Sequence, residues 1–414
     1  MTVGNLNSGE IDLDGANRIG AQDFAALDKA GCRPRTGDVL FSKDGSVGKV
    51  ALVRADGFVV LSSLAILRPK RKKLESRFLT YVLESPEGAQ QIHAQYVGAA
   101  LRRITLDAIN ELELPVPQLK EQAAIARFLD HETARIDELI AKQERLIELL
   151  KEKRQAVVSH AVTKGLNPDA PMKDSGVEWL GEVPAHWVVG RLKVAAEVTD
   201  CKHVTADFVD DGIPLVSIRE VQSWFIDIRT AKRTTPEFAA QLSEGERELR
   251  PGDIVYSRNA TVGQAAMVPP GFDRVVMGQD VCRLRLRESL DSPEFLLFQL
   301  RSRSMEDQLG SVLIGSTFKR INVDTIKQLW CTWPPTSEEQ RTIVKYLEAE
   351  ASKYVRLLTA AHKSIELMQE RRTALISAAV TGKIDVRDWQ PPSYAADEAP
   401  ADLPMAAEES PRYG

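Results

Sequence analysis

The sequence predicts an α+β protein that contains one long unit twice, each copy being a globular α/β domain followed by a long helix. GDVLFSKDGSVGKVALV begins at Gly37, and GDIVYSRNATVGQAAMV begins at Gly252, an offset of 252 − 37 = 215. EKRQAVVSHAVTKGL from Glu152 and ERRTALISAAVTGKI from Glu370 have an offset of 370 − 152 = 218. The related offsets indicate one unit copied once. A chain of 414 residues is also long enough to require at least two domains.

Each globular domain combines predicted strands with short helices. Runs rich in Val, Leu, Ile and Phe, broken by Gly, Asp and Pro, are typical of strands and turns. Apolar residues at helical spacing predict short helices between them. The predicted strand regions are 38–42, 49–69 and 112–117 in copy one and 253–257, 264–286 and 329–335 in copy two, and the helical regions are 75–95 and 292–309.

A long amphipathic helix is expected after each globular domain. Prolines end the domains at 115–117 and 334–335, and apolar residues then recur at three-and-four spacing. Each stripe is roughly six turns long, which suggests that the two helices pack on each other. Antiparallel packing would place the globular domains at opposite ends of a rod of about 40 Å or more. The alternative is that both are ordinary core helices of one large domain. The stripes comprise Ile136, Leu139, Ile140, Leu146, Ile147, Leu150, Val157 and Ala161, and Tyr354, Leu357, Leu358, Ala361, Ile365, Met368, Leu375 and Ala379.

These patterns divide the chain into five segments. We expect a first globular domain at 1–118, a long helix at 119–165, a linker with a second globular domain at 166–335, a second long helix at 336–384, and a disordered tail at 385–414. Trp179 and Trp187 are expected to pack the linker onto a neighbouring element.

Composition limits the classes of protein to consider. The apolar share of 43% and the charged share of 27% are ordinary for a soluble globular protein. The absence of a long apolar run or a signal peptide pattern predicts a cytoplasmic protein without membrane contact. The four cysteines have no paired spacing and are expected to be buried thiols. A net charge of −5 means that any nucleic-acid binding depends on local basic surface.

No catalytic constellation repeats in the two copies. The six histidines lack metal-ligand spacing. DGSVGK, ending at Lys49, resembles a phosphate loop, but Lys43 stands where the first glycine is required. A repeated unit without a repeated catalytic group favours binding, with no cofactor or metal in this chain.

Polar and cationic residues repeat at two places and are candidates for contacting DNA. Ser42 and Lys43 precede a predicted turn and correspond to Ser257 and Arg258; such hydroxyls and cations bind phosphate oxygens or base edges. Beside a small-residue loop, Arg102 and Arg103 correspond to Lys319 and Arg320. The alternative for each residue is a solvated turn with an incidental charge. Further local basic surface is expected at 68–73 and 283–287.

Several segments together resemble the specificity subunit of Type I restriction-modification systems. They are the two GD-hairpin segments, the helix openings PQLKEQAAIARFLDHETARID and PPTSEEQRTIVKYLEAEASK, the helix ends AVTKGL and AVTGKID, and GVEWLGEVPAHW. The resemblance covers nearly the whole chain and keeps the segments in order.

This resemblance implies two target recognition domains that each read half of a split sequence in double-stranded DNA. The long helices would set the spacer and dock two modification subunits, with restriction subunits joining afterwards. S-adenosylmethionine, ATP and magnesium would be bound by those partners. Half-sites roughly one helical turn apart, about 34–36 Å, are then expected. Candidate contacts for the modification subunits are Glu121, Gln122, Glu338 and Gln340.

The two copies differ before the hairpin segment. In copy two the numbering advances by 252 − 172 = 80 from Met172 to Gly252, whereas in copy one it advances by 37 − 1 = 36 from Met1 to Gly37. The alternatives that would explain the shorter start of copy one are a late start codon, natural shortening or a defective first domain. We expect the first domain to be less stable than the second. Two rival functions stay open: an unrecognised DNA-modifying enzyme, and a scaffold whose repeated domains bind proteins.

Overall fold

Two compact units form the chain. The computed structural model describes all residues except 8, 98–101, 205–206, 272–273, 314–319 and 393–414. Unit 1 comprises Met1–Glu144 with His362–Gly414, and unit 2 comprises Arg145–Ala361. Each unit therefore contains one globular domain and one half of each long helix.

Unit 1 is built on a small antiparallel sheet in the order β4-β3-β5. Phe41 of the central strand lies opposite Val50 and Ala65 on its two neighbours, and its ring is fully buried. The elements of copy one are β1 (Leu6–Asn7), β2 (Glu10–Ile11), α1 (Ala21–Lys29), β3 (Val39–Ser42), β4 (Val50–Leu52), β5 (Leu64–Leu67), α2 (Ser76–Glu84), α3 (Pro86–Ala94) and α4 (Leu106–Asn110), after a 3-10 turn at Val3–Asn5.

Unit 2 repeats this sheet with an additional strand, in the order β14-β13-β16-β9. A second sheet, β10-β12-β11-β15, includes a parallel pair, β11 with β15. The elements before β13 are β6 (Met172–Asp174), β7 (Glu182–Pro184), β8 (Val188–Arg191), α6 (Leu192–Ala195), β9 (Ala196–Asp200), β10 (Phe208–Val209), β11 (Ile213–Val216), β12 (Arg233–Thr234) and α7 (Pro236–Ser243). The later elements are β13 (Ile254–Ser257), β14 (Ala265–Met267), β15 (Val276–Met277), β16 (Val281–Leu286), α8 (Pro293–Leu300), α9 (Arg303–Leu313), α10 (Val323–Lys327) and β17 (Trp330–Trp333).

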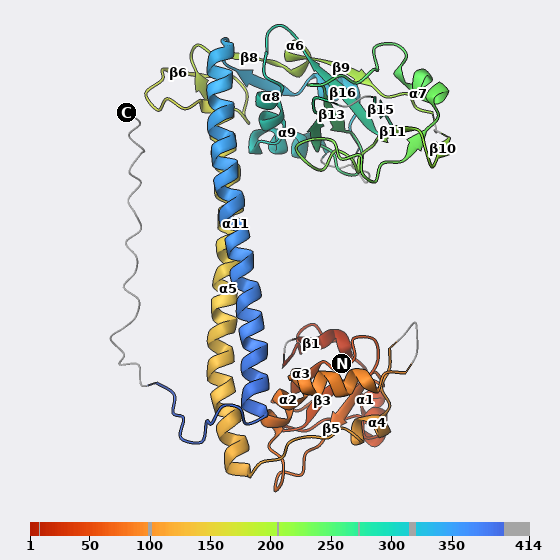
Figure 1. Cartoon of the computed structure of the whole chain (residues 1–414), viewed down its shortest axis with the longest axis vertical. Helices are drawn as coiled ribbons and strands as arrows, with labels where there is room; N and C mark the ends of the chain where they lie inside the picture. The colour runs from red at the N-terminus through yellow and green to blue at the C-terminus, as the bar shows by residue number, and fades with distance from the viewer. Residues whose placement is uncertain (8, 98–101, 205–206, 272–273, 314–319, 393–414) are drawn as a thin grey trace. The chain divides into compact units, whose positions relative to one another are not determined.

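The two long helices are α5 (Leu119–Lys164) and α11 (Ser337–Val380). In unit 1, Phe128 of α5 shares an apolar cluster with Ile376 of α11, and Asp137, later on α5, pairs with Arg372, earlier on α11. In unit 2, a side chain on Gly165, just beyond α5, would approach Glu339 at the start of α11. The helices run side by side and antiparallel in each unit (Figure 1). The predicted fold class, two α+β domains with two long antiparallel helices, is confirmed.

Two expectations about elements need correction. Residues 112–117 form no strand, although the equivalent β17 does, because β17 pairs with β8 and no described segment of unit 1 supplies such a partner. The tail expected from residue 385 begins with an ordered stretch: Val386 is buried, and Trp389 packs edge-on against Phe128 at 5.3 Å between ring centroids. The remainder of the tail, 393–414, lies outside the described residues.

The linker behaves as expected, whereas one cysteine does not. Trp187 is buried in the main core of unit 2, and Trp179 packs against a small cluster around Val183. All four cysteines are free thiols, but Cys32 is only partly buried. Within the described part of the chain, the helices lack the combination of length and apolar character that a membrane span requires.

Candidate nucleic-acid interface

The two cationic spots of copy one meet in space. The loop after β3 lies against residues 102–104, where Ile104 N–H donates to the Lys43 carbonyl at 3.0 Å and Gly45 N–H donates to the Arg102 carbonyl at 3.2 Å. Arg103 Nε also lies 2.5 Å from Asp44 Oδ1. The β3–β4 loop and the strand-like segment at 102–104 therefore form one surface, here called the hairpin platform.

Copy two forms the same platform from equivalent residues. Ile321 N–H donates to the Arg258 carbonyl at 2.9 Å, and Asn259 and Arg320 form a β-bridge. Arg320 Nη2 lies 3.7 Å from Asp280 Oδ1. Two segments that lie far apart in the sequence are thus brought together in the same way in both copies.

The cations of the platform differ in exposure. The Arg103 side chain is 67% exposed, Arg102 is exposed beside the Tyr96 ring, and Lys43 is partly buried. In copy two, Arg320 is 51% exposed, but the Arg258 side chain is only 4% exposed and pairs with Asp200 at 3.0 Å. Arg258 therefore stabilises the platform from inside the domain.

The two serines that were candidates for contacting DNA are buried. Ser42 and Ser257 end buried strands, and their residues are 0% exposed. Ser42 Oγ donates to the Ser46 carbonyl at 2.5 Å and accepts from Lys49 N–H at 2.8 Å, while Ser257 Oγ lies 3.0 Å from Thr261 Oγ1. The hydroxyls shape the loop because their hydrogen-bonding capacity is used inside it. The positive φ of Gly48 and Gly263, 93° and 94°, completes the turn at a position where a side chain would be strained.

A paired aspartate and arginine lie at the start of the central strand of each sheet, at the end away from the platform. Asp38 accepts hydrogen bonds from Arg68 Nε at 2.9 Å and from Arg68 Nη2 at 2.7 Å. Asp253 accepts the same two hydrogen bonds from Arg285, from Nε at 2.8 Å and from Nη2 at 2.7 Å. Bidentate pairs of this kind are among the stronger charge-assisted contacts. Burial by itself raises the pKa of Asp38, but the hydrogen bonds from Arg68 and the Arg35 amide hold it below its usual value.

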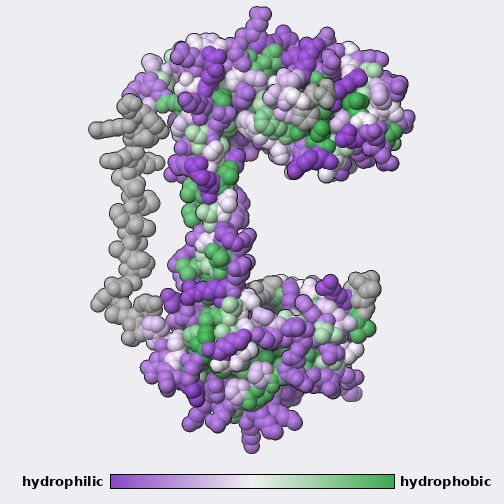
Figure 2. Space-filling model, in the orientation of Figure 1, coloured by the Kyte–Doolittle hydropathy of each residue, from purple (hydrophilic) through white to green (hydrophobic). Residues whose placement is uncertain are grey.

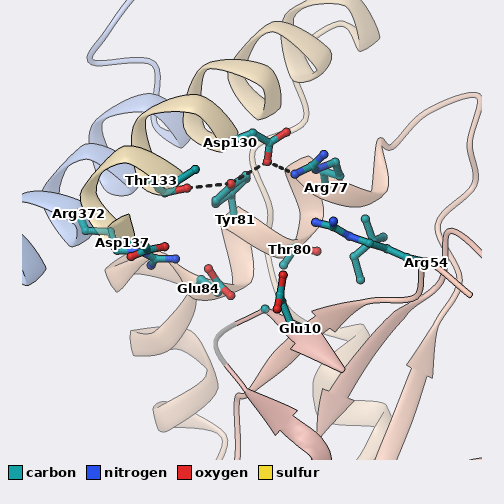
Figure 3. A pocket seen from close by; sticks show the side chains of 13 residues that line it. Glu10, Arg54, Arg77, Thr80, Tyr81, Glu84, Asp130, Thr133, Asp137 and Arg372 are labelled. Atoms are coloured by element: carbon teal, nitrogen blue, oxygen red, sulfur yellow. Dashed lines mark hydrogen bonds and ion pairs between the residues drawn. The ribbon is translucent and has the colours of Figure 1, made fainter. Parts of the chain in front are cut away.

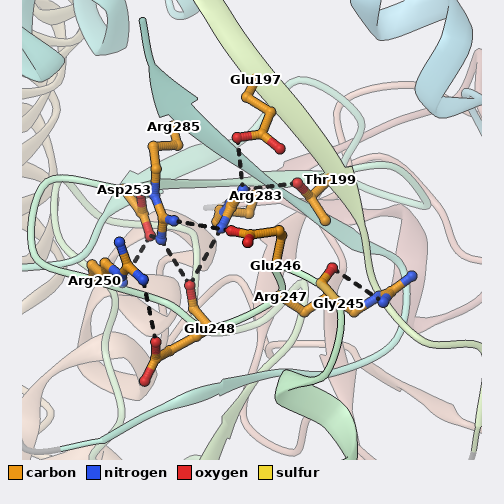
Figure 4. Close-up of polar contacts among 10 residues, drawn as sticks. All are labelled: Glu197, Thr199, Gly245, Glu246, Arg247, Glu248, Arg250, Asp253, Arg283 and Arg285. Carbon is orange, nitrogen blue, oxygen red and sulfur yellow. Dashed lines mark hydrogen bonds and ion pairs between the residues drawn. The ribbon is translucent and has the colours of Figure 1, made fainter.

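The basic surface predicted at 283–287 is wrong for Arg283. Its side chain is fully buried, donates from Nη2 to Thr199 Oγ1 at 2.9 Å and pairs with Glu197 at 3.3 Å (Figure 4). Burial, followed by the charge of Arg285, lowers the pKa of this guanidinium. Arg283 is buried because both faces of β16 are covered: Val281, on the same face as Arg283, belongs to one apolar cluster, and Leu284 on the other face belongs to another.

Gln122 and Gln340, predicted to contact partners, are buried and join each globular domain to its long helix. Gln122 Nε2 donates to the Pro117 carbonyl at 2.8 Å, and its Oε1 accepts from Glu75 N–H at 2.8 Å. Gln340 Nε2 donates to the Pro334 carbonyl at 3.0 Å, and its Oε1 accepts from Ser292 N–H at 3.2 Å. We call these two residues the glutamine clamps; their amides are not available to a partner in this state.

The remaining predicted residues differ in exposure, and some lie outside the described part of the chain. Glu121 is partly buried in the first turn of α5, and Glu338 is exposed in the first turn of α11. Lys319 and the small-residue segments at 98–100 and 314–317 lie outside the described residues. Their role therefore stays a prediction from the sequence.

One group of potential metal ligands was missed by sequence reasoning. Ligand atoms of Asp200, Cys201 and His203 lie within 4.8 Å of one another. Arg258 Nη2 is 3.0 Å from Asp200 Oδ1 and 4.0 Å from Cys201 Sγ, so a guanidinium already supplies positive charge there. Burial, then the Asp200 charge, raises the pKa of the Cys201 thiol, which further disfavours the thiolate that a metal requires.

Comparisons with known proteins cover both copies. The family model described as "Type I restriction modification DNA specificity domain" matches residues 7–149 and 235–367. The Type I restriction enzyme MjaVIII specificity subunit of Methanocaldococcus jannaschii is 23% identical over 357 residues, 85% of this chain and 80% of that protein. The putative MjaX specificity subunit of the same organism is 25% identical over 400 residues, 92% of this chain and 86% of that one.

Solved structures show the same fold. A chain from a structural study of complex assembly and conformational transition of the type I R-M system has a TM-score of 0.68 at 20% identity, covering 85% of this chain and 83% of that one. The HsdS subunit from Thermoanaerobacter tengcongensis has a TM-score of 0.50 at 20% identity, covering 84% of this chain and 82% of that one. With both copies matched by the family model, this chain belongs to the Type I restriction-modification DNA specificity family, as a specificity subunit.

Proposed function

We propose that this chain is the non-catalytic, DNA-reading subunit of a Type I restriction-modification complex. The observation that carries the proposal is the hairpin platform, which occurs once in each globular domain at equivalent positions. Each platform would contact one half of a bipartite site in double-stranded DNA. No catalytic group recurs in the two copies, which is why the chemistry is assigned to partner subunits that bind S-adenosylmethionine, ATP and magnesium.

Cations of each platform are proposed to contact DNA phosphates. In copy one these are Arg102 and Arg103, which are exposed, and Lys43, which is partly buried. In copy two they are Arg320, which is exposed, and Lys319, its neighbour in the sequence. Phosphate contacts position a protein on the duplex, and base edges are read by other side chains nearby. Ser42, Ser257 and Arg258 are assigned to shaping the platform, since their polar groups are engaged inside the domain.

The modification subunits are proposed to dock on the long helices. Figure 2 shows hydrophobic side chains between hydrophilic ones on the visible face of these helices. In unit 1, Leu139 is 50% exposed and Leu367 is 53% exposed; in unit 2, Leu149 is 44% exposed and Val355 is 56% exposed. Exposed apolar side chains on the helices are the usual centre of a protein interface, with charged residues such as Glu121 and Glu338 suited to its rim. Restriction subunits would join the assembled complex.

Methylome sequencing tests this function. Cells expressing the chain with its cognate modification subunit are expected to show a split methylated motif. Alanine at both Arg102 and Arg103 should weaken DNA binding by the complex and lower the salt slope of binding by about 1 for each phosphate that is no longer neutralised. Alanine at both Lys353 and Lys363, exposed lysines of α11 paired with Glu350 and Glu366, is the charge-matched control.

Other outcomes would indicate a different function for the chain. DNA modification by the purified chain alone, without a partner, would show an enzyme. Modification subunits that bind the chain without any sequence preference for DNA would show a scaffold. A motif with one specific half would mean that a single recognition domain reads DNA.

A further inference from the structure

The two units contain the same pocket with different charge. In unit 2 a pocket of about 680 Å³ lies between α5, the β13–β14 loop and α9, and in unit 1 a pocket of about 280 Å³ lies between the β3–β4 loop, α3 and α11. All nine residues that line the unit 1 pocket have an equivalent among the residues that line the unit 2 pocket. The offsets are 263 − 48 = 215 in the loop, 301 − 84 = 217 in the short helices and 372 − 154 = 218 in the long helices. We call these the copy-one pocket and the copy-two pocket.

The copy-one pocket is balanced by acids. Arg372 of α11, which lines this pocket together with Glu84 of α2, pairs with Asp137 of α5 at 3.0 Å. Figure 3 shows these three side chains in the neighbouring pocket, which all three line. Burial, opposed by Arg372, raises the pKa of Glu84. The single arginine of this pocket therefore has two carboxyl groups in its surroundings.

Copy two has neither of these acids at the equivalent positions. Arg301 stands at the position of Glu84, and Val355 stands at the position of Asp137, with an offset of 355 − 137 = 218. Arg154, equivalent to Arg372, has no ion pair among the described residues. Lys151, one turn earlier on α5, adds a further cation, although Glu148 pairs with it at 2.8 Å.

Arg301 in particular lacks a carboxylate. Its Nη2 donates to the carbonyls of Ser223 and Ala265 at 2.5 Å each, and its buried Nε has no hydrogen-bond partner in the described structure. Burial, then the positive charge of Arg154, lowers the pKa of Arg301. Glu306 is the acid lining the pocket, and it lies 3.8 Å from Arg303. Cations gathered in a partly enclosed site with little compensating acid attract an anion.

We propose that the copy-two pocket binds a phosphate group, with the exposed Arg154 as its principal ligand and the charge of Arg301 adding to the attraction. Guanidinium groups present planar pairs of N–H donors that match phosphate oxygens. The pocket is walled by residues 260–264 of the hairpin loop, which continues from the platform at Asn259. The inference rests on the proposed function, because a DNA backbone phosphate beside the platform is one source of the group and a free nucleotide is the other.

The test uses the full chain and three probes: inorganic pyrophosphate, adenosine monophosphate and a short DNA duplex. Arg154→Ala should weaken pyrophosphate binding about tenfold, the usual worth of one charge-assisted contact. Val355→Asp, which restores the acid of copy one at an exposed position, should weaken it similarly without removing an arginine. Lys353→Ala, with the same loss of charge on α11 in unit 2, should leave it unchanged. Calorimetric titration measures all three affinities.

The probes separate the sources of the phosphate. A lower salt slope for the duplex with Arg154→Ala identifies a backbone phosphate, whereas an unchanged duplex slope with weakened monophosphate binding identifies a free nucleotide. Failure of the wild-type chain to bind pyrophosphate and monophosphate, with equal duplex slopes for wild type and Arg154→Ala, overturns the proposal. That failure leaves the methylated motif intact, whereas failure of the proposed function removes the motif whatever the pocket binds.

Discussion

The two globular domains are attached to the long helices through differently arranged apolar cores. In unit 2 the attachment belongs to the main core: Trp187 and Phe295, with ring centroids 6.1 Å apart, belong to one cluster with Val162 of α5 and Ile343 of α11. The same cluster includes Tyr256 and other side chains of the main sheet. The sheet and the helices of unit 2 thus share a single core.

In unit 1 the sheet and the attachment to the helices have separate cores. Its sheet has a core around Phe41 and Ile104, whereas the attachment to the helices is a second cluster around Phe78 and Phe128. Polar contacts flank the attachment: Arg77 pairs with Asp130, and the Tyr81 hydroxyl donates to the same carboxylate at 2.8 Å (Figure 3). The same backbone plan therefore tolerates either one core shared by sheet and helices or a divided core, with the Arg77–Asp130 pair at the attachment of unit 1 here called the polar joint.

Removing the ring at the centre of the attachment has the largest expected effect. Phe295→Ala should cost about 3–5 kcal/mol of unfolding free energy, because a fully buried aromatic side chain is lost from a shared core. Hydrogen exchange should show lower protection in the sheet of unit 2 as well as in the neighbouring helices. The measurement is mass spectrometry of amide exchange, resolved by segment.

Phe78→Ala is the matched variant in unit 1, since Phe78 is equally buried at the equivalent position. Its cost should be similar, but the loss of protection should be confined to the attachment and spare β3 and β5. Equal spread of the loss in both units would contradict the distinction between a shared and a divided core.

The glutamine clamps should have similar effects in both units, because two contacts of each clamp are equivalent: the amide of Glu75 or Ser292 and the carbonyl of Pro117 or Pro334. Gln122→Leu and Gln340→Leu each leave buried backbone groups without a partner, at about 1–3 kcal/mol. Gln369→Leu, at an exposed position on α11, is the control and should change stability little. Urea unfolding of the full chain, followed by segment-resolved exchange, measures each unit. A large effect in one unit alone would show that the clamps are not equivalent.

The clamps also show what the sequence alone could predict. The repeat, the two long helices and the family follow from spacing and motif order. Residues that match in both copies were candidates for function, yet Gln122, Gln340, Ser42 and Ser257 match because both copies need the same buried hydrogen bonds. Identity between copies does not distinguish a fold requirement from a contact. The exchange of Glu84 for Arg301 was visible in the sequence. Its meaning depends on Arg372, which lines the same pocket as Glu84, and on Arg154, which lines the same pocket as Arg301, and both pairs are distant in the sequence.

The smallest effect concerns pH in unit 1. Because burial raises the pKa of Glu84 above its usual value of 4.5, the folded state binds this proton more readily than the unfolded state. The stability of unit 1 should therefore decrease as pH rises from 4.5 through the raised pKa, and the penalty should be fully present at higher pH. Glu84→Gln keeps the shape of the protonated acid and should weaken this dependence while stabilising unit 1 at neutral pH.

Unit 2 is a poor reference for this measurement, because burial also raises the pKa of its own acid, Glu306. The comparison is therefore made within unit 1, between wild type and Glu84→Gln, by urea unfolding at several pH values. Glu138→Gln, a change at an exposed acid of α5, controls for the loss of one negative charge. If Glu84→Gln leaves the pH dependence of unit 1 unchanged, Glu84 is ionised in the folded state at little cost. The polar joint of unit 1 would then be as well solvated as an ordinary surface, and its divided core alone would distinguish it from unit 2.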